Sequence, residues 1–163
     1  MTKVIWAPWR MEYILSEKPG ECILCLDRDE TNDRKRLIVY RSSRSFVMLN
    51  RYPYNNGHLM IAPFTHCANI EDLDPETSLD MFGLVQKAIR IMKECLQPEG
   101  FNIGINLGRV GGAGVEEHLH IHIVPRWNGD TNFMAVISDV RVMPEHLEDS
   151  YNKLRPYFQE LDS

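Results

Sequence analysis

Three histidines alternate with apolar residues in the stretch His118-Leu119-His120-Ile121-His122-Ile123-Val124-Pro125-Arg126-Trp127. Because successive side chains of a β-strand point to opposite faces, this pattern predicts a strand with one apolar face in the core and all three histidines on the other face. A rise of about 3.3 Å per residue sets the imidazoles ~7 Å apart along one row. They are therefore close enough to act together on a single polyphosphate.

A row of imidazoles is suited to phosphate chemistry. A neutral imidazole nitrogen can attack phosphorus, and the protonated form donates hydrogen bonds to phosphate oxygens or to a leaving group. One alternative is that the histidines lie on a polar sheet face without a function. This is disfavoured, because three of the chain's six histidines occur here in strict alternation. Another is a metal site, because alternate strand histidines supply two ligands to one ion in some zinc enzymes. The pattern favours nucleophilic chemistry.

The segment before the triad predicts a partner strand. From Phe101 to Leu107 apolar residues alternate with polar residues and glycines, which indicates a strand with one face in the core. Asn106 then faces away from the core. A glycine-rich connection at 108–114 leads into the triad strand, so we expect the two strands to form an antiparallel pair.

Two further strands are predicted nearer the N-terminus. Short apolar runs at 45–50 and 58–62 are separated by the turn-forming residues Arg-Tyr-Pro-Tyr-Asn-Asn-Gly. We expect these runs to form two strands joined by a loop.

Two helices complete the expected fold. A long amphipathic helix begins at Pro75, after Asp74, and its apolar residues recur at helical spacing as far as Pro98. A shorter amphipathic helix begins near Pro144 and is expected to be disturbed by Pro156. The prediction is an α+β fold, an antiparallel sheet with one long helix and a C-terminal helix.

Length and composition are those of a single domain. The chain has 163 residues, 44% of them hydrophobic, and single domains most often contain about 100–150 residues. We expect one domain over 1–163, with an N-terminal segment at about 1–35 and a C-terminal extension at about 131–163.

A net charge of -5 without a Lys/Arg block disfavours a nucleic acid polymer as partner. The N-terminal residues have no apolar run of signal-peptide length, and no later run approaches the ~20 residues that span a bilayer. We therefore expect a cytoplasmic protein without a membrane partner.

The motif HLHIHIV at 118–124 matches the His-x-His-x-His-x-x signature of the histidine triad (HIT) superfamily of nucleotide hydrolases and transferases. The resemblance covers about two thirds of the chain. SFVMLNRYPYNNGHLMIAPFTH at 45–66 is similar to the family's first hairpin, and FNIGINLG at 101–108 to the strand that pairs with the triad strand. WAPWRMEYI at 6–14 and VPRWNGDTNF at 124–133 further resemble the branch that contains diadenosine polyphosphate hydrolases and phosphorylases.

The resemblance implies roles for individual residues. The central histidine, His120, corresponds to the family's nucleophile, and His118 is another member of the catalytic triad. His122 would donate a hydrogen bond to the α-phosphate or to the departing oxygen. Asn50, at the end of the first hairpin strand, corresponds to a ribose-binding position. His58 either lines the nucleoside pocket or has a structural role in the hairpin.

The sequence departs from the family's pattern just before the triad. Many members have a Gln or a Ser there that binds phosphate, but Gly114 and Val115 occupy those positions. Backbone N–H groups of a tight loop can form an anion-binding concavity instead, which makes Gly112, Ala113 and Gly114 candidate phosphate-binding residues. The alternative is a flexible hairpin loop. The resemblance also places the polar side chain of Asn106 close to the α-phosphate.

Cys22 and Cys25 form a CxxC motif. In a cytosolic protein such a motif is more often a metal site or a redox pair than a structural disulfide. The resemblance implies that His66 and His118 complete a Cys₂His₂ zinc site, as in some triad proteins. A closed four-ligand site is structural. The alternative is a pair of reduced, partly buried cysteines.

The function implied by the resemblance is cleavage or transfer at the α-phosphate of a nucleoside phosphate, through a nucleotidyl-histidine at His120 and without an organic cofactor. Diadenosine polyphosphates are the expected substrates, and a homodimer is the expected assembly. Water as acceptor makes the enzyme a hydrolase and phosphate makes it a phosphorylase. No residue chooses between them. The alternatives are a non-catalytic nucleotide-binding or adaptor protein and a zinc-dependent enzyme that uses the triad as metal ligands.

Overall fold

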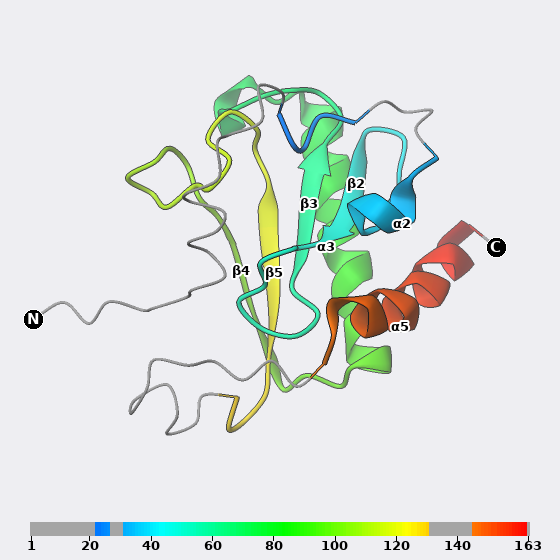
Figure 1. Cartoon of the computed structure of the whole chain (residues 1–163). Coiled ribbons are helices and arrows are strands. Elements are labelled where there is room, and N and C mark those ends of the chain that lie inside the picture. The colour runs from blue at the N-terminus through cyan, green and yellow to red at the C-terminus, as the bar shows by residue number, and fades with distance from the viewer. Residues whose placement is uncertain (1–21, 27–30, 131–144, 163) are drawn as a thin grey trace, which may run out of the picture.

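The computed structural model describes residues 22–26, 31–130 and 145–162. These residues form a five-stranded sheet in the order β1-β2-β3-β5-β4 (Figure 1). The strands are β1 (Ile38–Arg41), β2 (Ser45–Leu49), β3 (Leu59–Pro63), β4 (Gly100–Ile105) and β5 (Ile121–Arg126). All neighbours are antiparallel, so the expected α+β fold is confirmed. β5, which carries the last histidine of the triad, His122, lies between β3 and β4.

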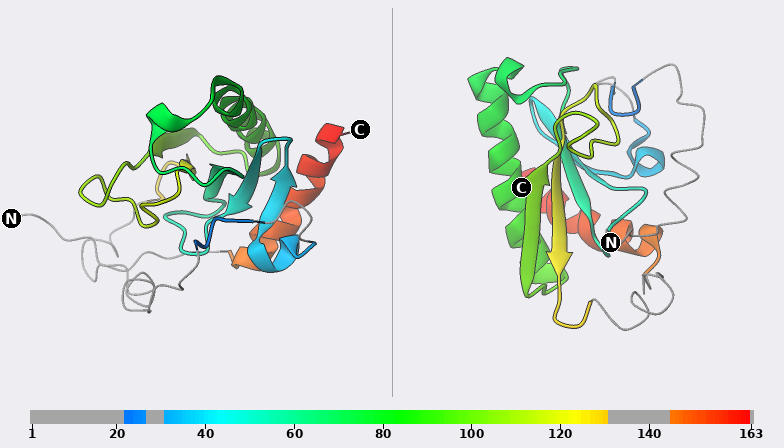
Figure 2. Two further views of the ribbon diagram at one scale, coloured as in Figure 1. Left: turned by 90° about the horizontal axis from the view of Figure 1, so that it is seen from above. Right: turned by 90° about the vertical axis from the view of Figure 1, so that its left-hand side faces the viewer.

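Two helices cover one face of this sheet. They are α3 (Pro75–Cys95) and α5 (Leu147–Gln159), and Figure 2 shows α3 running along one side of the strands. Their buried side chains join those of the facing strand residues in one core cluster, which includes Val47, Leu59, Ile123, Leu84 and Phe158. The remaining elements are short: α2 (Asp33–Arg36), η1 (Ile70–Asp72) and η2 (Glu160–Asp162). In the described part of the chain, no helix has the length and apolar content needed to cross a bilayer.

The opposite face of the sheet is partly covered by the residues at 22–26, which we call the cysteine segment. Leu24, between the two cysteines, is fully buried and packs in a second cluster with Phe46, Met60 and Ala62. Met60 lies opposite His122 in the β3–β5 pairing. The cysteine segment therefore shares its side of the sheet with the triad, away from the two long helices.

Helix α3 begins where the sequence predicts. The Asp74 carboxylate accepts a hydrogen bond from the Thr77 backbone N–H at 2.9 Å, and Pro75 occupies the first helical turn. Both residues suit a helix start. The first backbone N–H groups of a helix have no partner within it, so a carboxylate can accept from one of them, and proline has no N–H group that would need a partner. The buried side of α3 repeats at helical spacing and faces the sheet.

Helix α5 differs from its prediction. It begins at Leu147, and the predicted start near Pro144 lies outside the described residues. Pro156 lies inside the helix and does not end it. A proline in a helix interior costs about 3 kcal/mol, and the nearly complete burial of Tyr151, Leu154 and Phe158 against the core offsets that cost.

Two strand predictions hold only in part. The alternation from Phe101 to Leu107 predicted a strand with one face in the core; Phe101 and Ile105 do pack against the core cluster, but Ile103 between them is 47% exposed. β4 is the last strand of the sheet, and α3 packs mainly on β2 and β3. The triad strand also starts later than predicted, at Ile121, so His118 and His120 precede its ladder. Strand β1, which the sequence reading missed, is short and irregular in register against β2.

Candidate active site

A pocket of about 510 Å³ opens on the face of the sheet that carries the triad. His120 and His122 line it, with ring centroids 4.7 Å apart. One set of lining residues is apolar and comes from the cysteine segment, from β2 and β3, and from the residues before β5: Ile23, Leu24, Met48, Met60 and Val115. Another set is polar or cationic: Asn32, Lys35, Arg36, Asn50, Arg51, Tyr52 and Tyr54. The pocket thus combines an apolar wall with two imidazoles and several cations.

His120 is held with one ring nitrogen toward the backbone. Its Nδ1 lies 2.9 Å from the His118 carbonyl oxygen, and a carbonyl can only accept, so Nδ1 carries the proton. In the neutral ring the lone pair is then on Nε2. Burial lowers the pKa of His120, and the hydrogen bond to the His118 carbonyl opposes this. A buried imidazole of lowered pKa is neutral at pH 7 and has a nucleophilic nitrogen.

His122 receives its tautomer from His58. The Tyr54 backbone N–H donates to His58 Nδ1 at 3.1 Å, so the proton of a neutral His58 lies on Nε2. That Nε2 lies 3.0 Å from His122 Nδ1. His122 Nδ1 therefore accepts, and its own proton lies on Nε2. The Tyr54 ring stacks on His58, with centroids 4.9 Å apart.

The sequence left two roles open for His58, and the described geometry bears on that choice. His58 is fully buried and lies behind His122 rather than in the lining of the pocket. The residue that sequence reasoning missed is Tyr54, whose N–H and ring both hold His58. Tyr52 and Tyr54 lie in the cluster of turn residues, where no periodicity singles them out.

Asn50 lines the pocket, as a ribose-binding residue must. Its Oδ1 accepts a hydrogen bond from the Tyr52 N–H at 2.8 Å, and its backbone N–H donates to the His58 carbonyl at 2.8 Å. Asn50 therefore also fixes both ends of the loop between β2 and β3.

The glycine-rich loop is folded on itself. The N–H of Gly112 donates to Arg109 O at 3.0 Å, and that of Ala113 donates to Gly108 O at 3.2 Å. These two N–H groups are thus used within the loop rather than directed at an anion. Gly112 and Gly114 line the pocket, whereas Asn106 donates to the Gly112 carbonyl at 3.4 Å and so holds the loop.

The candidate metal ligands Cys22, Cys25, His66 and His118 lie together. One ligand atom from each lies within 4.8 Å of all the others. Cys22 Sγ is 3.4 Å and Cys25 Sγ is 3.7 Å from His118 Nδ1, and Cys25 Sγ is 3.1 Å from His66 Nδ1. A tetrahedral zinc ion with bonds of about 2.0–2.3 Å keeps its ligand atoms roughly 3.3–3.8 Å apart. The donor set fits zinc, and the two distances from the cysteine sulfurs to His118 Nδ1 fall within this range.

His118 is oriented toward this cluster. Its Nε2 lies 2.8 Å from the Pro63 carbonyl oxygen and so carries the proton, which leaves the Nδ1 lone pair for the cysteine side. Burial lowers the pKa of His118, which favours the neutral ring that a metal requires. Burial is also the main cause of the raised pKa of the Cys25 thiol. His118 is fully buried and does not line the pocket.

Residues 31–129 match the HIT domain. The chain therefore belongs to the histidine triad (HIT) family, and the resemblance read from the sequence is confirmed. The N-terminal segment at 6–14, which resembles the branch of diadenosine polyphosphate hydrolases and phosphorylases, lies outside the described residues.

Three similar proteins extend the comparison. AP-4-A phosphorylase of Mycobacterium tuberculosis (strain ATCC 25618 / H37Rv) is 38% identical over 156 residues, which are 90% of this chain and 79% of the relative. Bis(5'-adenosyl)-triphosphatase of Dictyostelium discoideum is 28% identical over 133 residues, 78% of this chain and 89% of the relative. A Zn-bound histidine triad family protein from Mycobacterium smegmatis has a TM-score of 0.63 and 31% identity, and the match covers 77% of this chain and 86% of that protein.

Proposed function

We propose that this protein is an enzyme that cleaves dinucleoside polyphosphates at the α-phosphate, with His120 as the nucleophile. The observation that supports this most directly is the hydrogen bond from His120 Nδ1 to the His118 carbonyl. It leaves the Nε2 lone pair of a buried, neutral imidazole at the wall of a nucleotide-sized pocket. The names of the relatives from Mycobacterium tuberculosis and Dictyostelium discoideum support the substrate class.

In the proposed first step, His120 Nε2 forms a bond to the α-phosphorus, and the bond from that phosphorus to the bridging oxygen breaks. The departing oxygen takes the electron pair and receives a hydrogen bond or a proton from His122 Nε2. In the second step an acceptor oxygen attacks the nucleotidyl phosphorus, and His120 leaves as the neutral ring. Each step exchanges one bond to phosphorus for another.

The pocket provides places for the rest of the substrate. We assign the nucleoside base to the apolar wall formed by residues such as Ile23 and Met48, and the ribose hydroxyls to Asn50. The phosphates then lie beside His120 and His122, near Gly112 and Gly114. Lys35, Arg36 and Arg51 supply positive charge in a protein of net charge -5. Such local charge favours a polyphosphate.

We further propose phosphate as the acceptor, because the relative at 38% identity, matched over 90% of this chain, is named a phosphorylase. Hydrolysis is the second candidate, since the Dictyostelium discoideum relative is named a triphosphatase. The two reactions share the first step and differ only in the oxygen nucleophile of the second.

The test is to incubate the purified protein with diadenosine tetraphosphate, with and without radiolabelled inorganic phosphate. Phosphorolysis yields ATP and ADP, with the label in the β-phosphate of ADP, whereas hydrolysis yields ATP and AMP without label. The His120→Gly variant is the matched control for contaminating activity. Tight binding without turnover of any dinucleotide would replace this proposal with the non-catalytic binding protein.

We propose that Cys22, Cys25, His66 and His118 hold a structural zinc ion. The support is the fit of the donor set, the orientation of His118 by Pro63, and a zinc-bound relative of similar fold. Bound there, the ion would hold the cysteine segment to the residues before β5. Because four protein ligands fill a tetrahedral site, it would have no role in activating the nucleophile.

We also propose that two chains associate through the β4 side of the molecule. β4 ends the sheet in the described residues, and Ile103 on it is 47% exposed. Leu79 and Phe82, in α3, add further exposed apolar surface, at 76% and 59% exposed. Edge strands and exposed apolar side chains are favourable for pairing with another chain. Sedimentation equilibrium tests this, and a monomer throughout the micromolar range would contradict it.

A further inference from the structure

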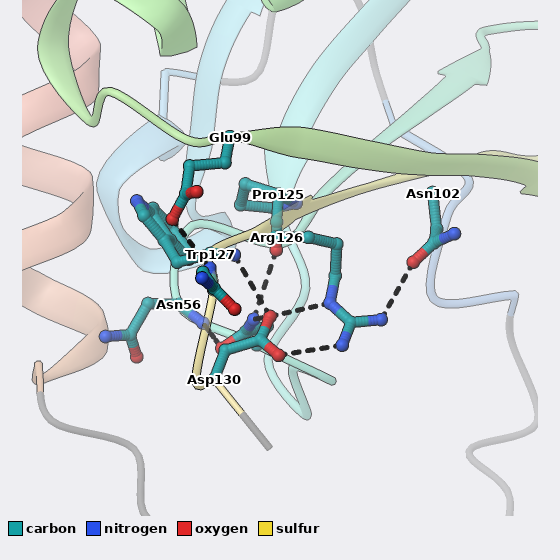
Figure 3. A network of polar contacts seen from close by, with 9 residues as sticks. Asn56, Glu99, Asn102, Pro125, Arg126, Trp127 and Asp130 are labelled. Carbon is teal, nitrogen blue, oxygen red and sulfur yellow. Dashed lines mark hydrogen bonds and ion pairs between the residues drawn. The ribbon is translucent and has the colours of Figure 1, made fainter. Parts of the chain in front are cut away.

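The carboxylate of Asp130 gathers hydrogen bonds from two separate parts of the chain (Figure 3). It accepts from Arg126 Nε at 2.6 Å, from Arg126 Nη2 at 2.8 Å and from the Trp127 N–H at 3.2 Å, all near the end of β5. It also accepts from Asn55 Nδ2 at 2.8 Å. The Asp130 side chain is only 10% exposed, so these bonds are shielded from water.

Asn55 belongs to the loop between β2 and β3, and it connects that loop to β5. Its Nδ2 donates to the Pro125 carbonyl at 3.1 Å as well as to Asp130. The backbone carbonyl of Asn55 accepts a hydrogen bond from the His58 backbone N–H at 3.2 Å. Asn55 therefore links the triad strand to the residue that contacts His122.

The same loop contains the donors that orient His122. Tyr54, next to Asn55, donates its N–H to His58 Nδ1, and His58 Nε2 lies 3.0 Å from His122 Nδ1. A displacement of this loop changes both distances at once. A loss of the His58 contact leaves His122 without the partner that keeps the proton on its pocket-side nitrogen.

We propose that Asp130 is a positioning residue for the reaction, which acts through Asn55 to hold His58 against His122. Asp130 does not line the pocket and has no contact with substrate in this proposal. Its effect is on the tautomer of His122 and thus on the hydrogen bond to the departing oxygen. The catalytic part of this inference depends on the proposed role of His122, whereas the tautomer itself does not.

Two further polar contacts near Asp130 are made to residues outside the loop between β2 and β3. Arg126 Nη1 donates to Asn102 Oδ1 at 2.9 Å, in β4. Glu99 Oε1 accepts the Asn128 N–H at 2.7 Å, in the same turn as Asp130. Figure 3 shows both contacts beside the Asp130 carboxylate. Glu99→Ala thus removes a hydrogen bond from this turn without affecting Asn55, and it is the matched control.

The first readout is the tautomer of His122, observed by long-range ¹H–¹⁵N spectra of the protein labelled on its histidine rings. In the wild type we expect a fixed Nε2–H form. Asp130→Ala and Asn55→Ala should each give a mixture of tautomers at His122, while Glu99→Ala should not. Unchanged His122 ring shifts in both loop variants would overturn the proposal, whatever their melting temperatures.

The second readout compares two adenosine 5′-phosphate esters, of phenol and of 4-nitrophenol. Phenoxide is the poorer leaving group and needs the His122 hydrogen bond more. Asp130→Ala should lower kcat for the phenyl ester on the order of ten- to a hundredfold, within the range that acid catalysis supplies, and lower it far less for the 4-nitrophenyl ester. KM should change little.

An equal fall of kcat for both esters would mean a general structural role and would overturn the proposal. If Asp130→Ala does not fold, Asn55→Ala gives the same ester comparison. If the wild type cleaves neither these esters nor diadenosine tetraphosphate, the proposed function has failed, and the His122 tautomer still decides whether Asp130 positions the ring.

Discussion

His120 and His122 face one pocket with complementary chemistry, because different neighbours set their tautomers. For His120 the neighbour is a main-chain carbonyl, which no substitution at position 118 removes. For His122 the neighbour is a side chain, that of His58. The tautomer of the proposed nucleophile is therefore fixed by a backbone group, whereas the tautomer of the proposed donor depends on a loop that single substitutions can disturb.

Replacing His120 by Ala or Gly should lower turnover on the order of 10⁴-fold or more, since the group that bonds to phosphorus is lost. Nucleotide binding should largely survive, because the proposed binding groups are other residues. Product formation and equilibrium titration with nucleotide measure the two effects. With a slow substrate, mass spectrometry should place an acid-labile nucleotidyl group on His120. A label on any other residue, or a near wild-type rate in the variant, would contradict the covalent mechanism.

Asn50→Ala should mainly raise KM, by about five- to tenfold if one hydrogen bond of about 1 kcal/mol is lost equally in the ground and transition states. Asn50→Asp is the control, because it keeps the oxygen that accepts from the Tyr52 N–H. Steady-state kinetics with diadenosine tetraphosphate separates the two parameters. A large fall in kcat at constant KM in the Ala variant would argue against ribose recognition.

Sequence reasoning predicted which histidines share a face, but not where each ring turns. Alternation is a local property, so spacing predicted the three histidines on one strand face, although only His122 lies within the β5 ladder. Their ring orientations depend on partners far away in the chain, such as Pro63 for His118. The two possible roles of His58 stayed open for the same reason. The contact that bears on them comes from Tyr54, in a loop without periodicity.

At the scale of the helix, the stability that Asp74 gives to the start of α3 depends on pH. Hydrogen bonds from the Thr77 side chain and backbone N–H lower the pKa of Asp74. Its contribution to stability is therefore fully present above the ordinary carboxyl pKa and is lost as the pH falls through the lowered, folded-state pKa. Asp74→Ala should lower the melting temperature at pH 7, and the difference from wild type should shrink in acid.

Thermal unfolding monitored by circular dichroism between pH 7 and pH 3 measures this dependence. Glu71→Ala is the control, because Glu71 lies exposed in the turn before α3. A difference between Asp74→Ala and wild type that stays constant across this range would contradict the capping role of the carboxylate.

Helices and strands were easier to predict where the features that determine them are local in the sequence. α3 was predicted from its cap, its proline and a long apolar repeat, all of which are local. β4 was predicted as a strand with a core face, and Phe101 and Ile105 do pack on the core. The exposure of Ile103 could not be predicted, because it depends on which strands α3 packs against. The extent of α5 beyond Pro156 likewise depends on burial of Phe158, which lies after the proline.

For the whole molecule, the cysteine–histidine cluster predicts a stability that depends on metal. Removing the ion should lower the melting temperature before it lowers the intrinsic rate, because the ligands join the segment at 22–26 to the residues before β5. Binding should weaken at acidic pH, since the ligands must be deprotonated. Elemental analysis of protein purified without added metal should find about one zinc per chain.

Cys22→Ser and Cys25→Ser should each lose metal and stability, whereas Cys67→Ser, outside the cluster, should lose neither. Metal-free wild type of full stability would remove the zinc proposal and leave the triad chemistry unaffected. Loss of turnover on chelation in a protein that remains folded would instead favour the zinc-dependent enzyme.

The position of β5 between β3 and β4 has a consequence for how the chain reaches its native state. β2 with β3 is a hairpin and can form early, but Leu59 pairs with Ile123 only after the intervening helix and β4 have been placed. Contacts so distant in sequence close late, because loop closure loses entropy before any contact compensates for it. His58 and His122 lie on the two sides of this late contact. We therefore expect folding intermediates to contain much of the sheet before the histidine pair is assembled, so that recovery of activity lags behind recovery of secondary structure.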